Sequence, residues 1–261
     1  MSTKSETTTT TVAGETSPLL SGPSAAGPEP FTYTIRPARL SDIPCMSSLA
    51  ACAYLNSSFI AFLYPSRHAY ISSHAYSFSQ RIRYRMLSPR CVSLIAVSST
   101  GLAVGYAQFE RRGDDAAALE RERNGNTWIF LLTKIWLYAR FAWDYATFRD
   151  KSVDQRRMKV VVDVGDLWHG EVKNRWHAQS VVVSPGHQRR GIGKALMMQV
   201  MQMARDEKVP LGLEASIEGE RLYTKLGFEL LRRFGMNIEG LEEEEKYGGL
   251  MVYYPPGCER E

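Results

Sequence analysis

The stretch from Val181 to Leu196 constrains the fold of this chain more than any other part of its sequence. Three valines predict the end of a strand, and the residues after them predict a turn that leads into a helix. A helix N-terminus presents backbone N–H groups and the positive end of its dipole, which together favour a phosphate group. Gly191 and Gly193 have no Cβ atom, so a ligand can approach the backbone there. The sequence therefore predicts a phosphate or pyrophosphate site at this turn, flanked by the cations Arg189, Arg190 and Lys194.

Spacing separates three kinds of phosphate-binding loop. A P-loop needs Gly-Lys-Ser/Thr, but Ile192 and Gly193 follow Gly191 here. A dinucleotide fingerprint needs a third small residue, and Leu196 stands at that place. The pattern that fits is V-x-V-x-P-x-x-Q-x-x-G-x-G, which ends at Gly193. It resembles the acyl-CoA-binding motif of the GNAT superfamily, the acyl-CoA-dependent N-acyltransferases.

A second segment, from Glu214 to Phe228, is similar to the closing segment of that family. A strand ends, a short helix carries Leu-Tyr, and Gly-Phe leads into the next strand. Many relatives have Asn and Ala where this chain has Ser216 and Gly219, but the Ser216 hydroxyl can still donate one hydrogen bond. Taken alone, the segment would fit a helix that packs on a sheet and ends at a glycine.

The resemblance implies a site and a cosubstrate, acetyl-CoA. Backbone N–H groups of the strand would bind the thioester carbonyl and the pantetheine arm. Tyr223 matches the tyrosine that gives a proton to the departing thiolate, and a phenol is a reasonable acid for that step. The implied binding residues are Val181, Val182, Val183, Gln188, Arg189, Arg190, Gly191, Ile192, Gly193, Lys194, Ala195 and Ser216.

The general base has two candidates. The offset of His177 from Gln188 matches the position where several family members carry a glutamate base. Two-residue alternation predicts that His177 shares a strand face with Gln179, Val181 and Val183. A purely structural histidine is the competing interpretation, and Glu214 is the alternative base.

Composition narrows the class of protein. A net charge of +4 suits a polyanionic cosubstrate and is too small to predict nucleic-acid binding. The four cysteines have no metal or disulfide spacing, which favours reduced thiols in an intracellular, cytoplasmic protein, with a nuclear location left open. The histidines show no metal-ligand spacing either, so we expect no metal.

The predicted fold is a mixed α/β domain with a central mixed sheet of about seven strands flanked by helices. Residues 1–30 are rich in Ser, Thr, Gly and Pro and are expected to form a disordered tail. Residues 31–256 form a single GNAT-like domain with an insertion at about 111–175. By resemblance, the parallel strands Trp176–Val183 and Leu211–Ala215 splay apart around the acyl-thioester. The residue pattern predicts a further strand at Val160–Val164.

Two helical segments have more than one interpretation. The arginines of the predicted helix Ser77–Leu87 are interpreted as a solvated face. The apolar, aromatic segment Thr127–Ala146 is interrupted by charges, which disfavours stable membrane insertion. We expect a helix mostly buried against the domain or a dimer partner, and a lid over the acceptor site is the alternative.

The sequence therefore predicts an N-acetyltransferase that moves an acetyl group from acetyl-CoA to the primary amine of a small molecule. A protein or peptide N-acetyltransferase and a non-catalytic acyl-CoA-binding regulatory module are the alternatives. A homodimer stays open.

Overall fold

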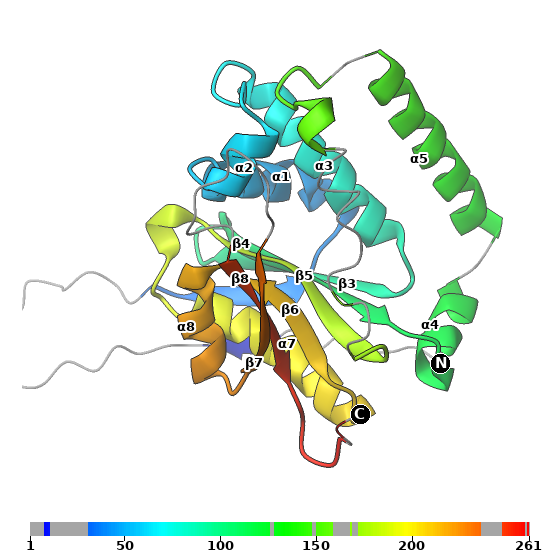
Figure 1. Cartoon of the computed structure of the whole chain (residues 1–261), viewed down its shortest axis with the longest axis vertical. Helices are drawn as coiled ribbons and strands as arrows, with labels where there is room; N and C mark the ends of the chain where they lie inside the picture. Colours follow the sequence, from blue (N-terminus) through cyan, green and yellow to red (C-terminus); the bar gives the residue numbers. More distant parts are fainter. Residues whose placement is uncertain are drawn as a thin grey trace, which may run out of the picture.

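The protein is built around one mixed sheet, shown in Figure 1. The computed structural model describes residues 8–10, 31–125, 128–147, 150–158, 168, 172–235, 247–258 and 260. Within these residues eight strands pair in the order β1-β2-β3-β4-β5-β6-β8-β7, and only β5 and β6 run parallel. Without the three-residue β1, the sheet has the seven strands that the sequence predicts. The strands are β1 Thr8–Thr10, β2 Tyr33–Pro37, β3 Cys91–Ser98, β4 Ala103–Arg112, β5 Arg175–Val183, β6 Leu211–Ala215, β7 Glu229–Gly235 and β8 Tyr247–Tyr253.

Helices cover both faces of the sheet. The apolar stripe of α7 packs on one face, with Leu196 and Val200 fully buried, and α1 and α3 pack on the other around Met46 and Ile82. We call these the α7 face and the α3 face. The helices of eight or more residues are α1 Ile43–Ala53, α3 Ile71–Leu87, α4 Ala116–Gly125, α5 Trp128–Ala146, α7 Ile192–Glu207 and α8 Ile217–Lys225, and the shorter ones are α2 Ser58–Leu63, η1 Leu40–Asp42 and η2 Pro185–His187.

Two predicted segments are described only in part or not at all. Of the tail predicted to be disordered, only Thr8–Thr10 is described, and it pairs antiparallel with the outer edge of β2. Threonine is β-branched, which suits a strand that occupies an open sheet edge. The strand predicted at Val160–Val164 lies outside the described residues.

The parallel strands β5 and β6 form a fork. They pair only at Trp176↔Leu211 and His177↔Gly212, so the rest of β5 diverges from β6. On its other edge β5 stays paired with β4 as far as Val183. Because alternate backbone groups of a strand point to opposite edges, half of those in Val181–Val183 face the opening of the fork. The predicted splayed pair is confirmed.

A β-bulge at Gln179 corrects the predicted alternation along β5. Gln108 pairs with Ser180 and Phe109 with Ala178, so Gln179 is the extra residue. Before the bulge His177 faces the α3 side, but after it Val181 and Val183 pack on the α7 face. The prediction that they share a face with His177 is therefore wrong, because strict two-residue alternation does not survive an inserted residue.

Helix α5 is oriented with its polar side toward the protein. Arg140 and Asp144 form an i,i+4 ion pair at 3.4 Å, and both contact the hydroxyl of Tyr76 on α3. Only Leu137 is buried among the α5 side chains that the structure describes. The expectation of a helix mostly buried against its own domain is wrong, and α5 lies along the outer side of α3 (Figure 1). Its exposed apolar residues are Trp128, Leu131, Leu132, Ile135, Trp136, Tyr138 and Trp143.

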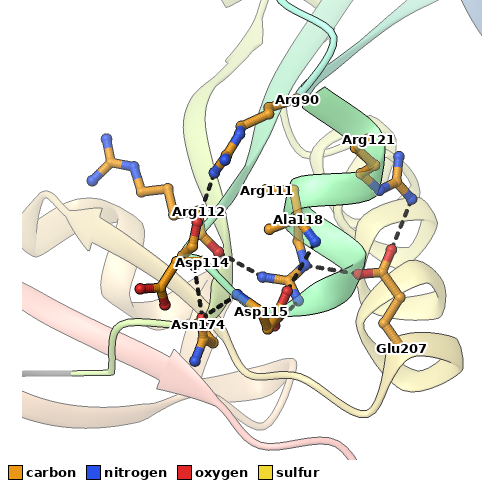
Figure 2. A network of polar contacts seen from close by, with 10 residues as sticks. Arg90, Arg111, Arg112, Asp114, Asp115, Ala118, Arg121, Asn174 and Glu207 are labelled. Carbon is orange, nitrogen blue, oxygen red and sulfur yellow. Dashed lines mark hydrogen bonds and ion pairs between the residues drawn. The ribbon is translucent and has the colours of Figure 1, made fainter. Parts of the chain in front are cut away.

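Helix α4 is tied to the sheet by a buried arginine. The side chain of Arg111 at the end of β4 is fully buried, donates to Glu207 of α7 at 2.7 Å and pairs with Asp115 (Figure 2). Asp115 also caps α4 by accepting the N–H of Ala118 at 2.9 Å, and Arg121 of α4 reaches the second oxygen of Glu207 at 2.7 Å. A buried charge needs such partners, so the network fixes α4 against the end of α7.

Candidate active site

The two candidate bases meet at the base of the fork. His177 is the last β5 residue paired with β6, and its Nε2 lies 3.1 Å from Oε2 of Glu214. Trp168 donates its indole N–H to the other oxygen of Glu214, and its ring meets that of His177 edge to face at 5.7 Å. Gly212 makes this packing possible, because a Cβ there would lie 2.5 Å from the Trp168 ring. The sequence treats His177 and Glu214 as alternatives, whereas the structure makes them partners.

Burial decides the protonation of this pair. His177 is 2% exposed, and burial lowers its pKa more than the contact with Glu214 raises it. Burial alone would raise the pKa of Glu214, but hydrogen bonds from His177 and Trp168 outweigh it and hold that pKa at about 2. At neutral pH the imidazole is therefore neutral, and Nε2–H donates to an ionised carboxylate. Nδ1 is then unprotonated, and this buried atom has no hydrogen-bond partner among the described residues, so it is the ring nitrogen left to accept a proton.

A second carboxylate lies on the other side of His177. Glu110 of β4 is the cross-strand partner of His177 and accepts from Gln179 at 2.6 Å and from Arg112 at 3.0 Å. Burial would raise the pKa of Glu110, but these two contacts outweigh it and lower that pKa. Glu110, His177 and Glu214 thus form a row of titratable groups across three strands on the α3 face.

Hydroxyl groups gather further along β5, past the bulge. Ser180 Oγ lies 3.3 Å from the hydroxyl of Tyr106, and Ser180 is close enough to the hydroxyl of Tyr54, at the end of α1, to act on its pKa. Burial raises the pKa of both tyrosines, so both stay protonated donors at neutral pH. The cluster lies on β5 beyond its last pair with β6, beside the opening of the fork.

Tyr223 approaches from α8. Its ring packs against Phe228 at 5.6 Å, and its pKa is raised by burial and by the proximity of Tyr54. Its phenol is therefore protonated throughout the neutral range. Ser216 begins α8 as its N-cap and accepts the N–H of Gly219 at 3.2 Å, which leaves the hydroxyl proton of Ser216 free to donate. Gly227, with φ +87°, ends this helix, as its sequence indicates.

The predicted phosphate loop joins β5 to α7. Gly191 is the N-cap of α7 with φ +77°, and Arg189 is also left-handed with φ +60°. A Cβ at Gly191 would meet only the Tyr33 hydroxyl, at 4.0 Å, so the space beside the backbone is open. Arg189 and Lys194 are exposed, while the guanidinium of Arg190 stacks on Phe31 at 4.6 Å. The first turn of α7 therefore offers backbone donors in a cationic setting, as an anion requires.

A cavity of about 440 Å³ opens on the α3 face beside the row of titratable groups. Its walls come from α3, α5 and strands β3 to β5, and its size suits a small molecule. Among the described residues, no group of three or more His, Cys, Asp or Glu side chains is arranged to hold a metal. Across the same residues, no helix is long and apolar enough to cross a membrane. The cavity is lined by Arg81, Tyr84, Arg85, Cys91, Glu110, Tyr138 and Gln179.

Several residues of this site escape sequence reasoning. Arg81 and Arg85 line the cavity, so the prediction that the α3 arginines form a solvated face is wrong for these two. Glu110 and Trp168 are distant from His177 in the sequence and come beside it only in the folded protein, so no local sequence pattern identifies them. Ser180 leaves a weak one, since it is a polar residue directly before three valines.

Comparisons with known proteins agree with this geometry. A family model described as an acetyltransferase (GNAT) domain matches residues 154–230, which include the fork, the phosphate loop and α8. A solved structure described as histone acetyltransferase HPA2 and related acetyltransferase, from Corynebacterium glutamicum, is 17% identical, with a TM-score of 0.56 over 87% of this chain and 98% of that chain. Arylalkylamine N-acetyltransferase 2 from Aedes aegypti is 13% identical, with a TM-score of 0.51 over 85% of this chain and 98% of that chain. No curated protein sequence matches the chain.

At such identities the solved structures establish the fold, and the family model identifies the domain. The loop, the fork and the closing helix lie inside the matched segment in the order that the sequence predicts. Residues 154–230 therefore match an acetyltransferase (GNAT) domain, and the chain shares the fold of the solved acetyltransferase structures that it resembles.

Proposed function

We propose that the protein transfers an acetyl group from acetyl-CoA directly to the primary amine of a small molecule. The observation that carries the proposal is the fork between β5 and β6. The proton-accepting pair of His177 and Glu214 lies where the strands still pair, hydroxyl donors lie along the side of the fork, and a turn suited to an anion lies beyond its open end. Acyl transfer needs these three features together: a proton acceptor, donors for the carbonyl and leaving group, and a hold on the polyanionic cosubstrate.

The cosubstrate is assigned to the loop 188–195 and the free edge of β5. Backbone N–H groups at the start of α7 would hold the diphosphate, helped by the charges of Arg189, Arg190 and Lys194. The exposed backbone edge of Val181–Val183 would pair with the amide groups of the pantetheine arm, and the Ser216 hydroxyl would add one donor.

The reaction follows from the protonation states. The neutral amine attacks the thioester carbonyl carbon, a C–N bond forms, and the proton lost from nitrogen passes to Nδ1 of His177, directly or through water. Glu214 stabilises the imidazolium that results. The C–S bond breaks, and Tyr223 gives its phenolic proton to the thiolate. Both groups exchange protons with water before the next turnover.

The acceptor is a small molecule because the cavity lined by Glu110, the cross-strand neighbour of His177, has the volume of a small-molecule site. The test is free-thiol detection with acetyl-CoA across a library of small amines and short peptides. Thiol release that requires a small amine supports the proposal. Release only with peptides would instead indicate a protein acetyltransferase, and binding of acetyl-CoA without release under any acceptor would indicate a binding module.

A further inference from the structure

The cavity beside His177 contains a positive charge that nothing in the described protein neutralises. Among the described residues, no hydrogen bond or ion pair engages the guanidinium of Arg85, and no carboxylate is among the groups that act on its charge. The acidic residue of the cavity lining, Glu110, accepts from Arg112 and Gln179 instead. An arginine that is partly buried without a partner forfeits hydration, which a bound anion would restore.

The groups around Arg85 are neutral and do not compensate its positive charge. Burial lowers its pKa, and the groups that act against this are the hydroxyls of Tyr106 and Tyr54 and the thiol of Cys91, all neutral at neutral pH. Arg81, one helical turn earlier, lines the same cavity and donates to the hydroxyl of Tyr64. Two guanidinium groups therefore face one carboxylate in a small space, and the cavity has a positive balance.

The charges are also placed asymmetrically. Glu110 is the cross-strand neighbour of His177, so the acidic side of the cavity adjoins the proposed base. Arg81 and Arg85 belong to α3, which covers the opposite wall. A molecule that carries an ammonium and a carboxylate would place its nitrogen near Glu110 and His177 and its carboxylate near Arg85.

We propose that the acceptor is a small aminocarboxylate, whose carboxylate binds Arg85 and whose amine is acetylated beside Glu110 and His177. The inference rests on the proposed function, since it assigns the acceptor of that reaction. Tyr84 and Tyr138, whose hydroxyls lie 3.3 Å apart across the α3–α5 boundary, line the remaining wall and favour a partly apolar side chain.

The test compares amines that differ only in the carboxylate. The common α-amino acids and short ω-amino acids are assayed beside their primary amides and their decarboxylated amines, with acetyl-CoA and free-thiol detection. We expect kcat/KM for the best carboxylate to exceed that of its amide by about 10- to 100-fold, the range of a charge-assisted contact. Arg85→Gln should remove that preference mainly through KM, and Arg83→Gln, on the same helix but outside the cavity lining, should keep it.

Two results would overturn the assignment. One is a wild-type enzyme that acetylates the primary amides or the decarboxylated amines better than the corresponding amino acids. The other is a preference for the amino acids that Arg85→Gln and Arg85→Met both retain. Calorimetric titration of the same compounds without acetyl-CoA keeps the two proposals apart. Carboxylate-selective binding that needs Arg85, without turnover, would reject the catalytic function and keep the pocket. Turnover that does not depend on Arg85 would keep the catalytic function and reject the carboxylate site at Arg85.

Discussion

At the scale of single residues, function depends on burial that fixes protonation. His177 is buried and neutral, Glu214 is ionised, and Tyr223 keeps its proton, which are the states that the proposed reaction requires of them. His177 and Glu214 are paired as in other catalytic pairs, in which a carboxylate orients an imidazole and stabilises the imidazolium.

Replacing Tyr223 with Phe tests the proton donor. The ring would still pack on Phe228, so acetyl-CoA binding should be nearly unchanged. Loss of the hydroxyl should lower kcat by about 10²-fold, as is typical when an acid–base group is removed. Steady-state kinetics together with calorimetric titration of acetyl-CoA check this, and wild-type turnover in a folded variant would remove Tyr223 from the mechanism.

Replacing Glu214 with Gln tests the base through its pH dependence. The carboxylate raises the pKa of His177, while burial lowers it below the ordinary value of 6.5. Removing the charge should therefore lower the pKa of His177 further, move the acid limb of kcat/KM to lower pH and reduce the maximum rate. The profile is measured with two acceptors of different basicity, and Glu229→Gln, an exposed carboxylate of β7, serves as the control.

If the acid limb of the kcat/KM profile shifts with the pKa of the acceptor and is unchanged in Glu214→Gln, it reports the deprotonation of the acceptor amine. His177 would then be a structural residue. Retention of such a limb in His177→Gln would lead to the same conclusion by an independent route.

At the scale of secondary structure, the sequence predicts best where local chemistry decides. The strand–loop–helix around Gly191 and the short helix that ends before Gly227 both follow from short-range rules, and the structure contains each of them. The bulge at Gln179 does not follow, because an extra residue in a strand has no mark of its own in the sequence. Arg81 and Arg85 share a helix face by spacing, but no local pattern tells which face meets a cavity.

The turn before α7 gives a prediction with a matched control. Gly191 has φ +77°, whereas Gly186, in the same loop, has no positive φ, and a Cβ there would meet nothing within 4 Å. Gly191→Ala should strain the backbone and misplace its N–H groups, lowering acetyl-CoA affinity by about tenfold. Gly186→Ala should leave it unchanged. Calorimetric titration checks both, and equal affinities in folded variants would move the phosphate site elsewhere.

Helix α5 turns its polar side toward the protein, so two adjacent residues of this helix should differ in their effect on stability. Leu137 is 2% exposed and Trp136 is 54% exposed. Leu137→Ala should lower the free energy of unfolding by about 2–3 kcal/mol, and Trp136→Gln should change it by less than about 0.5 kcal/mol. Urea denaturation measures both. A large loss in Trp136→Gln would mean that another surface, such as a second copy of the chain, covers the outer side of α5.

At the scale of the whole molecule, one sheet brings two candidate binding regions to one fork. The anion-binding turn comes from β5 and α7, and the cavity comes from the α3 face, so the cosubstrate and the acceptor would reach His177 from different elements. The sequence identifies the first region because its residues are contiguous. It cannot identify the second, since Arg85, Glu110, Tyr138 and Gln179 are brought together only by the folded sheet and its covering helices.

The central claim is that acyl transfer takes place in the fork between β5 and β6. A crystal structure of the protein with CoA bound tests it most directly. We predict the diphosphate on the N–H groups at the start of α7, the pantetheine arm along Val181–Val183, and the thiol within the fork near Ser180 and Tyr223. A thiol on the outer surface of the sheet, or a diphosphate away from residues 188–195, would contradict the account.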